Sequence, residues 1–90
     1  MDAFILLVDS TDRPSFPDGA ALVSVFTGYH AVPYLVAANK IDLEGAASLE
    51  EVRRGMGLSS DITVMPCQAT SKDSVHQVLS QVIELIEARK

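Results

Sequence analysis

Three short apolar runs, evenly spaced along the ninety residues, constrain the fold of this chain more than any other feature. They are Ala3 to Val8, Pro33 to Ala38 and Ile62 to Met65. Uninterrupted apolar runs of this length are typical of strands in a parallel sheet that is covered on both faces. We therefore predict three strands, and we expect the first two to be buried.

The segments between these runs have the sequence patterns of loops and helices. Residues 10–18 contain two prolines and several turn formers, so we predict a loop, followed by a helix over residues 19–30. Ser48 and Glu51 have the spacing of a capping box, in which each side chain accepts a hydrogen bond from the backbone of the other residue. We expect the helix that they open to be short and to end near Gly55 and Gly57.

The last predicted helix begins after Ser71 or Asp73, either of which can cap it. The element order is then β-α-β-α-β-α, which predicts an α/β fold with a three-stranded parallel sheet and right-handed crossovers. Leu85 is expected to lie off the apolar stripe of this helix. The residues that form the predicted stripe are Val75, Val78, Leu79, Val82, Ile83 and Ile86.

Residues that can make hydrogen bonds stand at the end of each predicted strand. Asp9 follows the first strand, Asn39 and Lys40 follow the second, and the segment Cys67-Gln68-Ala69 follows the third. In parallel α/β sheets, ligands bind beyond the carboxyl ends of the strands. We therefore expect these segments to lie together on one rim of the sheet.

The segment Asn39-Lys40-Ile41-Asp42 has the chemistry that recognition of guanine requires. Guanine presents its N1–H and its 2-amino group side by side, and the carboxylate of Asp42 can accept hydrogen bonds from both. Adenine offers no such pair of donors, and an unpaired buried group costs about 1–3 kcal/mol. The aliphatic part of Lys40 can cover the face of a base or ribose, and Asn39 can both donate and accept.

These residues resemble the guanine-specificity motif of GTP-binding proteins. Residues 7–16 resemble the segment after the fourth strand in Ras and Rab-type GTPases, and residues 67–70 are similar to the last nucleotide loop of that family. The chain thus resembles the C-terminal half of a Ras-like small GTPase domain (half of a P-loop GTPase domain), and it is similar to bacterial members that work beside roadblock-type proteins. The resemblance implies that GTP or GDP is bound by Asn39, Lys40, Asp42, Gln68, Ala69 and Thr70.

The phosphate-binding loop of such GTPases, Gly-x-x-x-x-Gly-Lys-Ser/Thr, does not occur in this sequence, because no lysine follows a glycine. We therefore assign no catalytic residue and expect weak or no binding of GTP or GDP by the isolated chain. Mg²⁺ would be bound only in a complete domain. Met1 stands almost directly before the first strand, which suggests that an upstream half has been lost or cut away.

Charge and cysteine content argue against some classes of binding partner and indicate a cellular location. A net charge of −5 without a basic run argues against nucleic acid and anionic lipid as partners. The run from Ala3 to Val8 is too short to span a bilayer. Cys67 is the single cysteine, so no intrachain disulfide can form, which fits a cytoplasmic location.

Two other hypotheses remain open at this point. The first is a non-enzymatic interaction module in which the strand from Ala3 to Val8 has an exposed apolar edge. That edge would pair with a second copy of the chain, or a partner would supply the missing half of the domain. The second is a flavodoxin-like or receiver-type α/β domain without a nucleotide.

Overall fold

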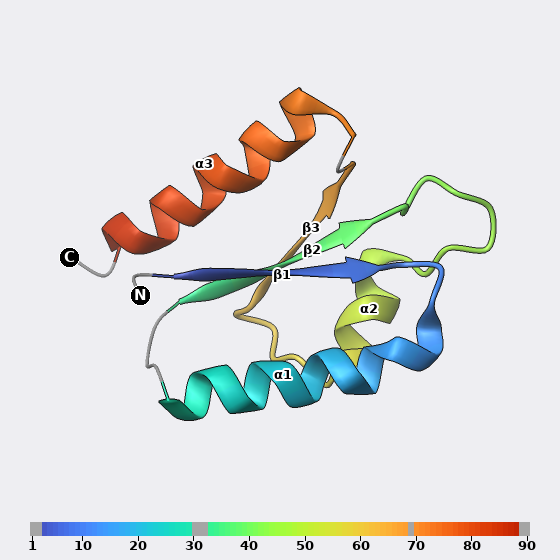
Figure 1. Ribbon diagram of the computed structural model, residues 1–90, viewed down its shortest axis with the longest axis horizontal. Helices are drawn as coiled ribbons and strands as arrows, with labels where there is room; N and C mark the ends of the chain where they lie inside the picture. The colour runs from blue at the N-terminus through green and yellow to red at the C-terminus, as the bar shows by residue number, and fades with distance from the viewer. Residues whose placement is uncertain (1–2, 30–32, 69, 89–90) are drawn as a thin grey trace.

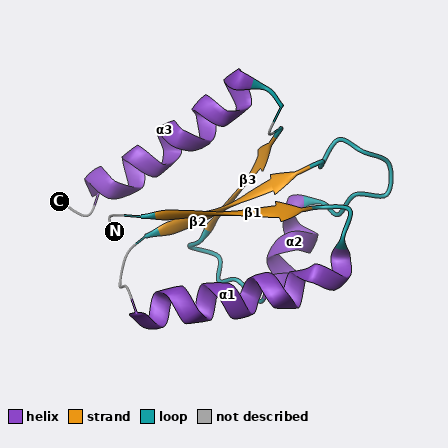
Figure 2. Cartoon of the chain, in the orientation of Figure 1, coloured by secondary structure: helices purple, strands orange, loops and turns teal. Residues whose placement is uncertain are grey.

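A three-stranded parallel sheet with helices on both faces forms the framework of the molecule (Figure 1). The computed structural model describes residues 3–29, 33–68 and 70–88. In chain order the elements are β1 (Phe4–Asp9), the 3-10 helix η1 (Arg13–Ser15), α1 (Phe16–Tyr29), β2 (Tyr34–Asn39), α2 (Leu49–Met56), β3 (Thr63–Cys67) and α3 (Lys72–Ala88). Helices α1 and α2 cover one face and α3 covers the other (Figure 2). The predicted α/β fold and element order are confirmed.

Strand β2 lies in the centre of the sheet, between β1 and β3. The side chains from Leu35 to Ala38 are at most 1% exposed. Because side chains alternate along a strand, Val36 and Ala38 pack with α1 and α2, while Leu35 and Ala37 pack with α3. This one strand supplies both cores, which explains its uninterrupted apolar sequence.

Strand β1 forms an edge of the sheet, so the prediction that it is buried on both faces is wrong. Val8 is 6% exposed and belongs to the core formed with α1 and α2. Leu7 pairs in register with Ala37 and therefore lies on the α3 face, where it is 54% exposed. Helix α3 packs on β2 and β3 and leaves this part of the sheet open.

Helix α1 begins at Phe16 rather than at Gly19, so the predicted loop is too long. A 3-10 turn containing Pro14 leads directly into the helix, and Pro17 stands in its first turn, where its missing N–H is not needed. Phe16 is only 4% exposed and joins the core, which fixes the start of the helix. The predicted end at His30 lies outside the described residues.

Helix α2 has the termini that its sequence predicts. The hydroxyl of Ser48 accepts a hydrogen bond from the N–H of Glu51 (3.1 Å), and the Glu51 carboxylate accepts one from the N–H of Ser48 (3.2 Å). Gly57 ends the helix at φ 64°, and its N–H donates to the carbonyls of Arg53 and Arg54. Glycine adopts this left-handed conformation without steric cost, so the capping box and the glycine stop are both confirmed.

Strand β3 extends to Cys67, two residues further than the predicted end at Met65. Cys67 is 5% exposed and packs in the core beneath α3, so its burial holds the chain in the sheet. The hydroxyl of Ser71 then accepts a hydrogen bond from the N–H of Ser74 (3.3 Å). Ser71 rather than Asp73 therefore caps α3.

The sheet-facing stripe of α3 differs from the predicted one. Leu79 and Ile83 are 47% and 53% exposed, whereas Leu85, which was predicted to lie off the stripe, packs against the core. Each residue turns the helix by about 100°, so one stripe recurs at alternating steps of three and four residues. The residues that pack in this way are Val75, Val78, Val82 and Leu85.

Candidate functional site

The carboxyl ends of the three strands lie at one level of the sheet, as predicted (Figure 1). Asp9 at the end of β1 pairs in register with Asn39 at the end of β2, and Asn39 pairs with Cys67 at the end of β3. The segments that follow the strands therefore leave the sheet side by side. This is the rim at which a parallel sheet places its ligands.

A hollow of about 230 Å³ lies at this rim, between the segments that follow β2 and β3. The structure brings the predicted site residues together here, with the exception of Ala69, which lies outside the described residues. Leu43, which was not predicted, adds an apolar wall and is 51% exposed. The lining consists of Asn39, Lys40, Asp42, Leu43, Gln68 and Thr70.

A tight turn directly after β2 places Asp42 at the hollow. Lys40 has φ 61°, a left-handed conformation that is rare for residues other than glycine, asparagine and aspartate. The N–H of Leu43 donates to the carbonyl of Lys40 (3.1 Å), which closes the turn. Ile41 packs against the core below, so the turn is anchored and the Asp42 side chain remains exposed.

The side chain of Lys40 is paired with Asp9 across the rim. Its Nζ lies 3.2 Å from Oδ2 of Asp9, and the other carboxylate oxygen of Asp9 accepts from the N–H (2.9 Å) and the hydroxyl (2.6 Å) of Thr11. These hydrogen bonds from Thr11, followed by the Lys40 ammonium, hold the pKa of Asp9 below its usual value. The pair ties the β1 end of the rim to the first residue after β2.

The β3 side of the hollow is held by the start of α3. The N–H of Gln68 donates to the hydroxyl of Ser74 (2.7 Å), and the carbonyl of Gln68 accepts from the N–H of Ser71 (2.8 Å). Gln68 is therefore fixed through its backbone, while its side chain is exposed at the hollow. Lys72, the first residue of α3, is also exposed.

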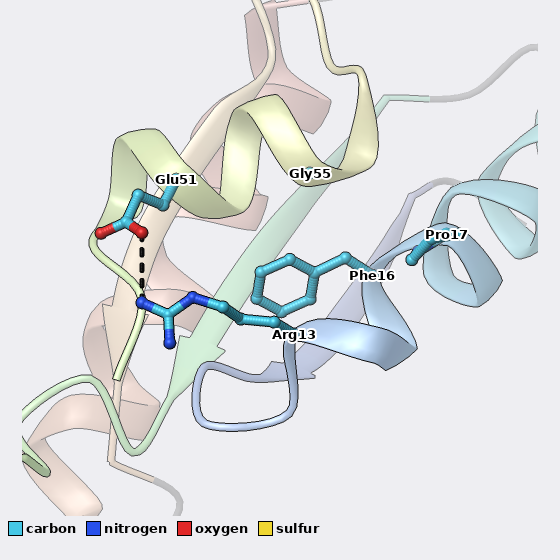
Figure 3. Close-up of a pocket in the computed structure, with 5 residues that line it drawn as sticks. All are labelled: Arg13, Phe16, Pro17, Glu51 and Gly55. Atoms are coloured by element: carbon cyan, nitrogen blue, oxygen red, sulfur yellow. Dashed lines mark hydrogen bonds and ion pairs between the residues drawn. The ribbon is translucent and has the colours of Figure 1, made fainter. Parts of the chain in front are cut away.

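A further set of contacts joins the loop after β2 to η1 and α2. Arg13 donates from Nη1 to the carbonyl of Gly45 (2.8 Å), and its Nη2 lies 3.1 Å from Oε2 of Glu51 (Figure 3). A hydrogen bond from the Ser48 N–H, followed by Arg13, holds the pKa of Glu51 below its usual value. The Arg13–Glu51 pair borders a second hollow of about 350 Å³, floored by Phe16. Nothing in the local sequence predicted this link.

The family model of the ADP-ribosylation factors (Arf) matches residues 1–86, which is nearly the whole chain. The chain belongs to the Arf family. This membership confirms the prediction of a Ras-like small GTPase domain and argues against a flavodoxin-like or receiver-type domain.

Complete GTPases of the Arf family bind a guanine nucleotide together with Mg²⁺. The polar groups around the hollow of this Arf-family chain suit the base end of such a ligand, because they combine a carboxylate acceptor, an ammonium and two amide side chains. The apolar Leu43 offers contact to the face of a flat ring. The donor set therefore fits a guanine base.

The glycine-rich loop that cradles phosphates does not occur in the sequence of this Arf-family chain. Within residues 3–29, 33–68 and 70–88, no group of three or more His, Cys, Asp or Glu side chains could hold a metal ion. The same residues contain no helix with the length and apolarity needed to cross a membrane.

Proposed function

We propose that this chain is the guanine-recognition part of a small GTPase domain. The observation that carries the proposal is the hollow at the carboxyl ends of the strands, where Asn39, Lys40 and Asp42 meet Gln68 and Thr70. Asp42 would accept hydrogen bonds from N1–H and the 2-amino group of guanine. Lys40 would cover the base with its aliphatic stem, and the N–H of Ala69 would donate to guanine O6.

We further propose that the chain corresponds to the C-terminal half of the domain and works in the cytoplasm. Its last nucleotide loop also favours the bacterial type that works beside roadblock proteins. The chain lacks the glycine-rich loop whose N–H groups cradle phosphates, so contacts to the phosphates and to Mg²⁺ would come from residues that it does not contain. We expect weak or no binding of GDP and GTP by the chain alone and no hydrolysis, because hydrolysis depends on those contacts.

Base selectivity tests the proposal directly. The affinities of the chain for GDP and for xanthosine diphosphate, titrated at millimolar concentrations, should favour GDP. Asp42→Asn should erode or reverse this preference, because an amide can donate to the xanthine oxygen that replaces the guanine amino group. We expect a change of at least about tenfold in the affinity ratio.

Asp18→Asn, which makes the same chemical change on α1, is the matched control and should keep the ratio of the unmodified chain. Equal affinities of the unmodified chain for both nucleotides would contradict guanine recognition. Tight, Mg²⁺-dependent GTP binding or hydrolysis by the chain alone would contradict the proposal that the domain is incomplete.

A second candidate function is that of an interaction module, and the open edge of β1 favours it. Ile5 and Leu7 of β1 are 37% and 54% exposed, and Leu22 and Phe26 of α1 are 49% and 41% exposed. An apolar edge strand of this kind is a template for pairing with another strand. We propose that β1 is covered by a second copy of the chain or by a partner that adds a strand.

A further inference from the structure

The loop that carries Lys40 and Asp42 is tied at its start to the end of β1 and at its end to the segment that follows β1. At its start, Lys40 is paired with Asp9 (3.2 Å). At its end, the N–H of Ala47 donates to the carbonyl of Ser10 (2.8 Å), and Arg13 donates to the carbonyl of Gly45 (2.8 Å). The position of the loop therefore depends on residues that lie more than thirty positions earlier in the chain.

Arg13 is the residue that joins this loop to two elements at once. One amino group of its guanidinium contacts the carbonyl of Gly45. The other contacts the carboxylate of Glu51 in the first turn of α2, as Figure 3 shows. The planar guanidinium presents its donors in a fixed fork, so these contacts define the distance between the loop and the helix. Gly45 has φ 81°, and its carbonyl is presented by a backbone bend that other residues rarely adopt.

Core packing contributes little to holding the middle of this loop. The consecutive residues Asp42, Leu43 and Glu44 are all exposed. The N–H of Ala46 donates to the carbonyl of Leu43 (3.1 Å), a contact within the loop that does not attach it to the sheet. The core holds the loop at Ile41 and at the fully buried Ala47, and Arg13 adds an attachment between them, at the carbonyl of Gly45.

We infer that Arg13 is a positioning residue for guanine recognition. It does not line the hollow beside Asp42, and it acts by holding the loop in which Asp42 stands. This inference rests on the proposed function. A loop that is not held would let Asp42 move, and two parallel hydrogen bonds to N1–H and the 2-amino group tolerate little displacement.

The test compares the affinities for GDP and for inosine diphosphate, which lacks the 2-amino group. Arg13→Gln should reduce the GDP preference by about fivefold. Loss of folded protein alone would lower both affinities equally and leave their ratio unchanged, so the ratio reports positioning. Hydrogen exchange of the Ala46 and Ala47 amides, measured without nucleotide, should be faster in Arg13→Gln by about tenfold.

Two matched variants separate the contacts of Arg13. Arg54→Gln removes the same charge from the exposed side of α2, where Arg54 lies near Glu50 (3.8 Å), and it should leave the ratio and the exchange unchanged. Glu51→Gln removes the ion pair but keeps an oxygen for the capping box, and it should change the ratio by less than about twofold.

The outcomes distinguish the inference from the proposed function. An unmodified chain that binds GDP and inosine diphosphate equally overturns the proposed function and the inference with it. If the chain alone binds neither nucleotide, the amide exchange decides, and unchanged exchange of Ala46 and Ala47 in Arg13→Gln overturns the inference. An unmodified chain that prefers GDP, together with an Arg13→Gln variant of the same preference, overturns the inference alone. Faster amide exchange with an unchanged affinity ratio also overturns it, because the loop would then be freed without effect on the base.

Discussion

At the residue scale, the rim is defined by a few charged side chains with short-range contacts. Lys40 takes a left-handed conformation and is paired with Asp9, whose carboxylate also accepts two hydrogen bonds from Thr11. Residues held in sparsely populated conformations tend to occur at functional sites, where the surrounding structure enforces them. The position of Lys40 at the hollow fits that tendency.

The low pKa of Asp9 predicts a pH-dependent contribution to stability. A carboxyl group whose pKa is lower in the folded state stabilises the fold above its unfolded pKa of about 3.9. That stabilisation is lost as the pH falls through the folded value. Asp9→Asn should therefore lower the free energy of unfolding at pH 7, and the two proteins should converge at pH values below the folded pKa.

Urea unfolding at a series of pH values measures this difference. Asp12→Asn, a neighbouring exposed position, is the control and should show no comparable convergence. A constant difference between Asp9→Asn and the unmodified chain across the series would show that the carboxylate charge is not the cause.

At the scale of secondary structure, the strands and helices could be predicted from the local sequence, whereas the contacts between them could not. The capping box at Ser48 and the glycine stop at Gly57 are local hydrogen-bond patterns, so they were predictable. The start of α1 was missed because burial of Phe16 decides it, and burial depends on α2. The packing side of Leu85 was missed because apolar residues occur on several sides of α3.

The candidate site likewise has residues that could be predicted from the sequence and contacts that could not. The position of Asn39, Lys40 and Asp42 at the hollow was predictable, because they stand in one short segment directly after a strand. The link from Arg13 to the carbonyl of Gly45 was not, because an arginine that donates to a distant backbone oxygen leaves no pattern near itself. Contacts between loops thus need the fold before they can be inferred.

Alanine substitutions at two helical glycines should have opposite effects on stability, because Gly55 of α2 lies against α1 and Gly28 of α1 lies in open space. A Cβ at Gly55 would lie 2.5 Å from Cδ2 of Phe16, so Gly55→Ala should lower the free energy of unfolding by about 1–3 kcal/mol. A Cβ at Gly28 meets no atom within 4 Å, so Gly28→Ala should raise it by about 0.5–1 kcal/mol through helix propensity.

Chemical denaturation of both variants under the same conditions measures the two effects. The Gly28→Ala variant controls for the general preference of helices for alanine. Equal stabilisation by both substitutions would mean that Phe16 can move away from α2 at little cost.

At the scale of the whole molecule, the sheet is covered unevenly. The central strand is buried by helices on both faces, whereas the β1 edge and the apolar side chains around it are open. Large exposed apolar areas of this kind usually mark surfaces that bind another protein. This open surface is the observation behind the proposal that a second copy of the chain or a partner covers β1.

The open edge predicts self-association of the purified chain. Size-exclusion chromatography with light scattering should show dimers or larger species, and Leu7→Lys should shift them toward the monomer, because a lysine on an edge strand disfavours pairing. Leu43→Lys, at an equally exposed position away from this edge, should leave the association unchanged. A stable monomer of the unmodified chain at high concentration would contradict pairing between copies.

The position of β2 between two cores has a consequence for how folding aligns Asn39 with the ends of the neighbouring strands. Its four buried residues alternate between the two sides, and they differ in size: Val36 and Ala38 face one side, and Leu35 and Ala37 face the other. A slip of one residue along β2 would exchange these sets and also carry Asn39 off its level with Asp9 and Cys67. A chain whose β2 strand is out of register would therefore also have a poorly packed core. Core packing thus selects the register in which Asp9, Asn39 and Cys67 lie at one level.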